Sequence, residues 1–213
     1  MLARGTAAAP ILFTGPVEVF GWYGIVLDDA PSPGSYLTNV RIENVQTALA
    51  VWTSANHPVV IDSAVFRNNG AAAWLYAADS RISHTRVDTT VYGDPAVRVA
   101  GQNRTIESLL IRGTLGKGLA VDSRTVQVLS CEIRDSGGDG IQLSDDSTVV
   151  HNCNLVNNGG VGISVADASY TANVENNWWG DAAGPTGPNG DGVGASLDYT
   201  TWRTSPYTLP YVP

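Results

Sequence analysis

The chain has 213 residues, a formal net charge of −8 and a single lysine, Lys117. This length allows one domain with a sizeable buried core. The many Gly, Ala, Val, Ser and Thr residues, with few charged ones, favour short strands and tight turns over long helices. The chain has no basic stripe, which argues against a nucleic-acid partner, and no apolar run is long enough to span a membrane.

The first six residues do not have the features of a signal peptide, because no basic segment is followed by a long apolar stretch. They are instead typical of the middle of a repeat. We therefore expect Met1 to begin a fragment from which upstream coils are missing.

A repeat of about 22 residues runs through the chain. Residues 118–121, 140–143 and 162–165 each contain two apolar residues separated by one variable residue, which is the period of a β-strand. Earlier members of this column are Leu49/Val51, Trp74/Tyr76 and Val97/Val99. A second column contains Val40/Ile42, Ala64/Phe66, Val87/Thr89, Leu109/Ile111, Cys131/Ile133 and Cys153/Leu155. A third contains Leu37, Ile61, His84, Ile106, Val128 and Val150.

Three inward columns predict three short strands per coil, and coils that stack like on like. The predicted fold is an all-β, right-handed, single-stranded parallel β-helix of about six to seven coils. The coils occupy residues 1–175, and a cap and tail rich in Trp, Gly and Pro occupy 176–213. A leucine-rich or helical solenoid is the alternative, but the segments are too short, too β-branched and too often broken by Gly.

Polar residues mark one corner of each coil. Asn and Gly tolerate the left-handed backbone that a sharp corner needs. We expect Asn44, Asn68, Asp135 and Asn157 to form a hydrogen-bonded ladder, interrupted at Val91 and Gly113.

The closing segment has no repeat. The last coil of a solenoid exposes its strand edges and core unless something covers them, so we expect Trp178, Trp179 and Trp202 to act as a cap, with sugar stacking as the alternative. Residues 181–193 contain carboxylates and Gly, as a Ca²⁺ loop does, but the spacing is not that of an EF-hand. No cofactor is expected, an ordinary loop is favoured, and Ca²⁺ remains the alternative.

Together these segments resemble a known family. Residues 5–15 and 21–25 are similar to the opening segment, and 174–180, 184–185 and 197–198 to the closing segment, of right-handed parallel β-helix proteins. These are secreted bacterial proteins of the pectate-lyase-like superfamily. The resemblance covers nearly the whole chain and implies the fold and an extracellular or cell-surface location. It does not specify an activity, because the superfamily includes lyases, hydrolases, epimerases, adhesins and scaffolds.

The cysteines and histidines do not form a recognisable catalytic set. Cys131 and Cys153 are one coil apart in the same column, within reach of a disulfide, but parallel stacking aims the side chains poorly, so two buried free thiols are favoured. His84 falls in an apolar column and is expected to be a buried, hydrogen-bonded histidine, with an acid/base residue as the alternative. His57 and His151 stand outside any triad spacing.

The turn after the third strand varies most in length, and function tends to reside on loops of a rigid scaffold. An exposed Trp beside carboxylates and an Arg suits a saccharide, whereas a plain solvated edge is the alternative. The glycan-binding candidates on this edge are Asp28, Asp29, Trp52, His57, Asp79 and Arg81.

The outward positions of the second strand are a second candidate site. Asp88 and Glu132 are two coils apart, which predicts Cα atoms about 9.6 Å apart, a spacing that suits an inverting glycosidase. Arg112 and Arg134 flank them, with Arg41 and Arg67 nearby, and a lyase uses Arg as its base. Leu110 intervenes, and any exposed sheet face carries charges, so ordinary surface charge is the alternative.

Three functional hypotheses follow. The first is a non-catalytic extracellular module that acts as a scaffold or binds glycans. The second is a polysaccharide lyase or glycoside hydrolase that works along the side of the helix. The third is the structural C-terminal part of a longer enzyme. The sequence leaves the oligomeric state open.

Overall fold

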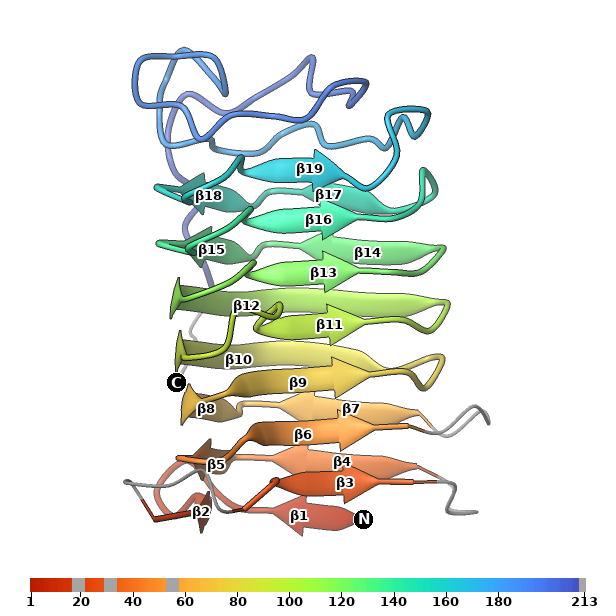
Figure 1. Cartoon of the computed structure of the whole chain (residues 1–213), viewed down its shortest axis with the longest axis vertical. Coiled ribbons are helices and arrows are strands. Elements are labelled where there is room, and N and C mark those ends of the chain that lie inside the picture. The colour runs from red at the N-terminus through yellow and green to blue at the C-terminus, as the bar shows by residue number, and fades with distance from the viewer. Residues whose placement is uncertain (17–21, 29–33, 53–57, 211–213) are drawn as a thin grey trace.

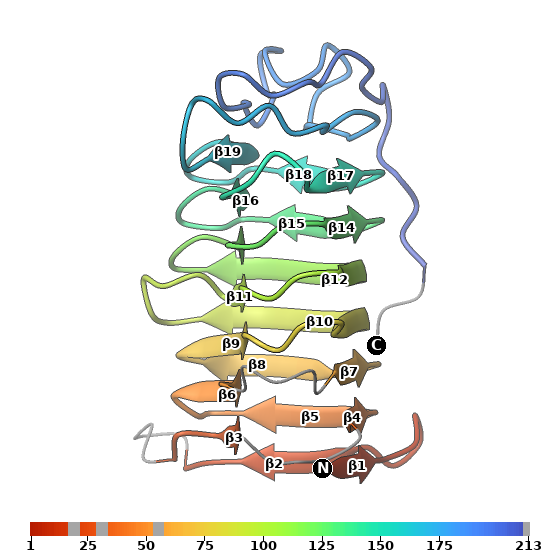
Figure 2. The same cartoon turned by 90° about the vertical axis from the view of Figure 1, so that its right-hand side faces the viewer.

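The computed structural model describes residues 1–16, 22–28, 34–52 and 58–210. Parallel strands stack on three faces along one long axis, which confirms the expected all-β parallel solenoid (Figures 1 and 2). The first face contains β1 (Leu2–Arg4), β4 (Ser35–Thr38), β7 (Val59–Asp62), β14 (Val126–Leu129) and β17 (Val149–His151). The second face contains β2 (Ile11–Thr14), β5 (Val40–Glu43), β8 (Val65–Asn69), β15 (Glu132–Arg134) and β18 (Asn154–Val156).

Two long strands, β10 (Arg81–Thr90) and β12 (Arg104–Thr114), continue around the corner and belong to both of these faces. The third face is a separate seven-stranded sheet. It contains β3 (Ile25–Leu27), β6 (Thr47–Val51), β9 (Ala71–Leu75), β11 (Val97–Val99), β13 (Leu119–Val121), β16 (Ile141–Leu143) and β19 (Ile163–Val165).

The core consists of apolar side chains that stack from coil to coil. On the second face Phe66 pairs with Val87, Val87 with Ile111, and Ile111 with Ile133, and all four side chains are buried. Burial of each such side chain contributes about 1.5–3 kcal/mol. The β-branched residues of this column suit the pleated surface and fix the register of successive coils.

Six successive coils turn both of their regular corners through a residue with left-handed backbone. The first corner, between the first and second faces, has positive φ at Asn39, Ser63, His84, Ser108, Ser130 and Asn152. The second corner, between the second and third faces, has it at Asn44, Asn68, Thr89, Gly113, Asp135 and Asn157. Small polar residues tolerate this backbone best. The amides of Asn68 and Asn157 donate to Asn44 and Asp135, so the expected ladder forms in two segments.

The coil that contains β10 corrects the predicted register by two residues. Ile82 pairs with Ile61 and Ile106, so Ile82 and not His84 continues the inward column. His84 occupies the corner instead, with 41% of its side chain exposed and Nδ1 3.0 Å from Asp62 Oδ1. The expectation of a buried histidine was therefore wrong.

The same shift moves the neighbouring assignments. Thr85/Val87, and not Val87/Thr89, face inward, and the corner ladder is interrupted at Thr89 rather than at Val91. The physical reason is that a shift of two residues preserves the alternation of inward and outward side chains, so the apolar pattern alone does not detect it.

On the third face the inward residues of β9 are Ala73 and Leu75, not Trp74 and Tyr76 as the pattern predicted. Ala73 lies between Leu49 and Val97 of the adjacent coils. A small side chain suits the close-packed space between two large neighbours. The two aromatic residues consequently lie on the outside of the solenoid.

Cys131 and Cys153 are buried free thiols, as favoured from the sequence. The Cys153 Sγ lies 3.4 Å from the backbone N of Cys131 and accepts its hydrogen bond. Burial raises the pKa of the Cys153 thiol well above its usual value, and a side-chain hydrogen bond with Cys131 adds to this, whereas the backbone hydrogen bond from Cys131 opposes it.

Coil-like pairing continues past residue 176. Trp178 pairs with Asn154, Val193 with Ile163, and Trp179 is fully buried at the end of the core. Trp202 lies at the surface, where its Nε1 donates to the Ala182 carbonyl. The chain then returns along the outside of the coils (Figure 2).

Asn177, next to these tryptophans, has a completely buried side chain. Its Nδ2 donates to the carbonyls of Val150 and Val174, both at 2.7 Å, and its Oδ1 accepts the Cys153 amide at 2.8 Å. The side-chain amide of Asn177 thus provides hydrogen-bond partners for three buried backbone groups, at the point where the regular pairing between coils ends.

Candidate functional site

An aromatic cluster lies on the outside of the third face. Trp74 is in β9, Trp52 directly follows β6, and Tyr76 directly follows β9. The ring centroids of Trp52 and Tyr76 are 5.0 Å apart at an interplanar angle of 28°, so the two rings stack. Trp74 meets Trp52 edge-on, at 5.9 Å and 72°. We call these three residues the aromatic platform.

The register of the solenoid produces this stacking. The Tyr76 amide donates to the Val51 carbonyl, and the Trp52 amide to the Leu27 carbonyl, so Trp52 and Tyr76 hold the same position in adjacent coils. Adjacent coils lie roughly 4.8 Å apart, which is close to the ring separation. The two rings are already stacked without a ligand, so binding needs less ordering of their side chains.

Polar side chains flank the platform. The outward column that contains Trp74 continues to Arg98 in the next coil. Arg98 Nη1 is 2.7 Å from Asp122 Oδ2, and Asp122 Oδ1 also accepts the Ser144 hydroxyl. Asp28 holds the same position as Trp52 in the preceding coil, so it borders the platform on the N-terminal side. An apolar aromatic surface is therefore bordered by hydrogen-bonding groups.

The structure brings together only part of the predicted glycan-binding edge. Asp28 and Trp52 lie in one column, whereas Arg81 belongs to the first face, where it pairs with Glu107. Asp79 is a corner residue with positive φ. Asp29 and His57 lie outside the residues that the structure describes.

The platform also contains two residues that the sequence analysis did not propose, Trp74 and Tyr76. The sequence feature that indicates them is the segment Trp-Leu-Tyr at 74–76, which directly follows the small residues 71–73.

The carboxylates proposed for catalysis do not align. Asp88 pairs with Arg112 in the next coil, and Glu132 pairs with Leu110. They are thus offset by two positions along the strand as well as by two coils, which places their Cα atoms about 12 Å apart. The predicted spacing of about 9.6 Å was wrong, because it assumed that both residues share one column.

Asp88 is held in ion pairs. Arg86 Nε lies 2.7 Å from Asp88 Oδ2, and Arg112 donates to Oδ1. Burial alone raises the pKa of Asp88, but the hydrogen bonds and charges of Arg86 and Arg112 outweigh it and hold the pKa below the usual value. A general acid needs a raised pKa, so this environment keeps Asp88 ionised instead.

Glu132 has different partners. Arg134 Nη1 is 3.8 Å from Glu132 Oε1, and Asn154 Nδ2 donates to Oε2. Asn154 in turn exchanges two hydrogen bonds with the backbone of Tyr207 in the returning tail. The tail therefore packs beside Glu132.

The part of the chain that the structure describes contains neither a metal-binding cluster nor a helix able to span a membrane. No group of three or more His, Cys, Asp and Glu side chains in this part of the chain is arranged to hold a metal ion. In the closing loop Asp181 accepts hydrogen bonds from the Ala183 and Asn189 amides, and Asp191 from Asn158. No helix in the described part is long and apolar enough to cross a membrane.

Comparison with known proteins identifies the family. Residues 23–179, well over half of the chain, match the family described as right handed beta helix region. The chain belongs to this family of right-handed β-helix proteins. No curated protein and no solved structure matches it.

Proposed function

We propose that this protein is a non-catalytic β-helix module that binds glycans outside the cell or at its surface, and that the aromatic platform is its binding site. The observation that carries the proposal is the stack of Trp52 on Tyr76, presented on the outside of a rigid sheet. Aromatic rings offer a large apolar contact area to the C–H groups of a sugar ring.

The flanking groups supply the polar part of the recognition. Sugar hydroxyls both donate and accept hydrogen bonds. Arg98 lies next to Trp74, and Asp122 and Ser144 continue the line of donors and acceptors two and three coils beyond Tyr76. The platform extends along the axis of the solenoid through adjacent coils. This geometry favours an extended oligosaccharide over a single sugar.

The test is binding to a glycan array, followed by titration of the best oligosaccharide. Trp52→Ala is expected to weaken binding roughly tenfold or more, because buried tryptophans at interfaces commonly dominate affinity. The matched control is Trp202→Ala, because the exposed fractions of Trp52 and Trp202 are 38% and 39%. The control variant is expected to bind like the wild type.

Two results would overturn the proposal. One is unchanged affinity in Trp52→Ala with intact circular dichroism. The other is the release of new reducing ends or unsaturated products from the bound polysaccharide, which would establish cleavage along the side of the helix instead.

A further inference from the structure

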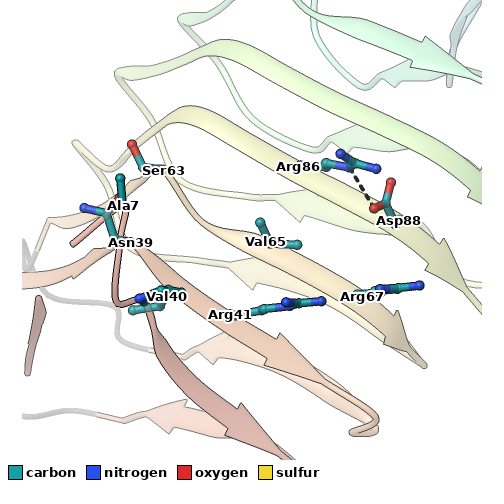
Figure 3. A pocket seen from close by; sticks show the side chains of 10 residues that line it. Ala7, Asn39, Val40, Arg41, Ser63, Val65, Arg67, Arg86 and Asp88 are labelled. Atoms are coloured by element: carbon teal, nitrogen blue, oxygen red, sulfur yellow. Dashed lines mark ion pairs between the residues drawn. The ribbon is translucent and has the colours of Figure 1, made fainter. Parts of the chain in front are cut away.

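A hollow of about 360 Å³ lies on the second face, near the N-terminal end of the solenoid and away from the aromatic platform. Its wall at one end is the turn that contains Ala7 and Pro10, which precedes β2. Val65 lies in the middle of the hollow, between the side chains of Arg41 and Arg86 (Figure 3). Its volume is within the range of sites for small molecules.

Three arginines from successive coils surround the hollow. Arg41 pairs in register with Val65, and Val65 with Arg86, so these three residues form one outward column. Arg67 belongs to the neighbouring outward column, between Glu43 and Asp88 of the adjacent coils, and both of these carboxylates pair with other arginines. Figure 3 shows the guanidinium groups of Arg41 and Arg67 extending in the same direction along adjacent strands.

These arginines differ in how their charge is balanced. Arg41 pairs with Glu43, and Arg86 with Asp88, which Arg112 also shares. Arg67 is exposed, and its guanidinium has no ion pair or hydrogen bond among the described residues. The lining thus contains three guanidinium groups and one carboxylate, although the whole chain has a net charge of −8. A positive hollow on an acidic protein attracts and concentrates anions.

The remaining lining is partly apolar and partly polar. Val65 separates Arg41 from Arg86 in the outward column. Ala7 and Pro10 add apolar surface at one end, where Asn39 and Ser63 also line the hollow. A free guanidinium at one side of such a surface matches a ligand with a charged end and an apolar body. A planar carboxylate fits the two parallel donors of an arginine.

We propose that this hollow binds a small organic carboxylate with an apolar body, with its carboxylate on Arg67 and its body against Val65. This site is separate from the aromatic platform, because it lies on another sheet of the solenoid. A test of carboxylate binding at this hollow therefore gives a result that does not depend on the proposed glycan binding.

The test is a titration of the whole ¹⁵N-labelled chain with benzoate, followed by backbone amide chemical shifts. We expect saturable shifts confined to the strands around Val65 and Arg67. Benzamide has the same body without the charge, and glucuronate has the carboxylate on a polar body; both are expected to bind at least roughly tenfold more weakly. Equal binding of either compound overturns the proposed ligand class.

Two variants test the two halves of the site. Arg67→Gln is expected to weaken benzoate binding roughly 10- to 100-fold, because a charge-assisted hydrogen bond is lost. Val65→Phe keeps every charge and fills the hollow, and it too is expected to weaken binding at least tenfold or so. An outward strand position accepts an aromatic residue well.

The matched control is Arg124→Gln, which removes the same charge at a corner, where 76% of the Arg124 side chain is exposed. It is expected to bind benzoate like the wild type. Equal affinity in Arg67→Gln and the wild type, or in Val65→Phe and the wild type, overturns the proposal, provided that the amide spectrum remains that of the folded chain. An equal loss of affinity in Arg124→Gln and Arg67→Gln also overturns it, since general surface charge would then explain the binding.

Discussion

Replacing Asn177 by alanine removes a single amide that connects three segments of backbone at the end of the core. The Asn177 side chain donates to the Val150 and Val174 carbonyls and accepts from the Cys153 amide. Alanine leaves all three backbone groups without a partner in a fully buried place. We therefore expect a large loss of stability from a change that removes little apolar surface.

The magnitude follows from the three hydrogen bonds. Each contributes about 1 kcal/mol net, and a buried group left without a partner costs about 1–3 kcal/mol. The free energy of unfolding should thus fall by about 3 kcal/mol at least, and by about 9 kcal/mol if no water enters. A domain has only about 5–15 kcal/mol in total.

The assay is urea denaturation followed by tryptophan fluorescence and circular dichroism. With a slope of about 1–3 kcal/mol per molar urea, a loss of about 3 kcal/mol lowers the midpoint by about 1 M or more. The control is Asn157→Gly, which removes an exposed amide that bonds only to Asp135 and keeps the left-handed backbone. It should cost less than about 1 kcal/mol. If the two variants unfold at the same urea concentration, the reasoning about buried amides is refuted.

Three further outcomes are expected. Asp88→Asn should be less stable than the wild type at about pH 7, and this difference in stability should vanish at low pH. The pKa of Asp88 in the folded chain lies below the ordinary value of 3.8, so the ionised carboxylate stabilises the folded chain at pH values above 3.8. This stabilisation is lost as the pH falls through the pKa of the folded chain. A difference that does not change with pH in urea melts would contradict this. Trp179→Ala should lower the free energy of unfolding by about 3–5 kcal/mol in the same melts, since Trp179 is fully buried, and a loss below about 1 kcal/mol would rule out its capping role. Cys131 and Cys153 should react with a thiol reagent only after denaturation, because both are buried and the pKa of Cys153 is raised; fast labelling of the native chain would contradict their burial.

Most of the solenoid was predictable because its core consists of stacked apolar residues at a constant spacing. Ile111, Ile133 and Leu155 show the principle, since each was assigned to the column where the structure places it. The coil around His84 failed because a shift of two residues keeps every inward side chain inward. A better guide there was the polar residue at the corner, since His84 takes the left-handed backbone that Ser63 has in the coil before.

The candidate site was harder to predict than the fold. Trp74 and Tyr76 have large side chains and alternate like the apolar pairs of the other coils, so the pattern placed the aromatic residues inside. The stacked coils instead hold the smaller pair in the core. Trp52 was correctly expected at the surface, but its partners became visible only when the register was known.

The uniform register also determines how such a chain can change in length. Val97 lies under Leu119, and Leu119 under Ile141. Loss of residues 119–140 would set Ile141 on Val97, and an apolar side chain would again meet an apolar side chain. Tandem duplication or loss of one unit therefore lengthens or shortens the rod without disturbing its interior. The outer faces gain or lose area by the same step, so evolution can resize the surface of this protein while its fold stays the same.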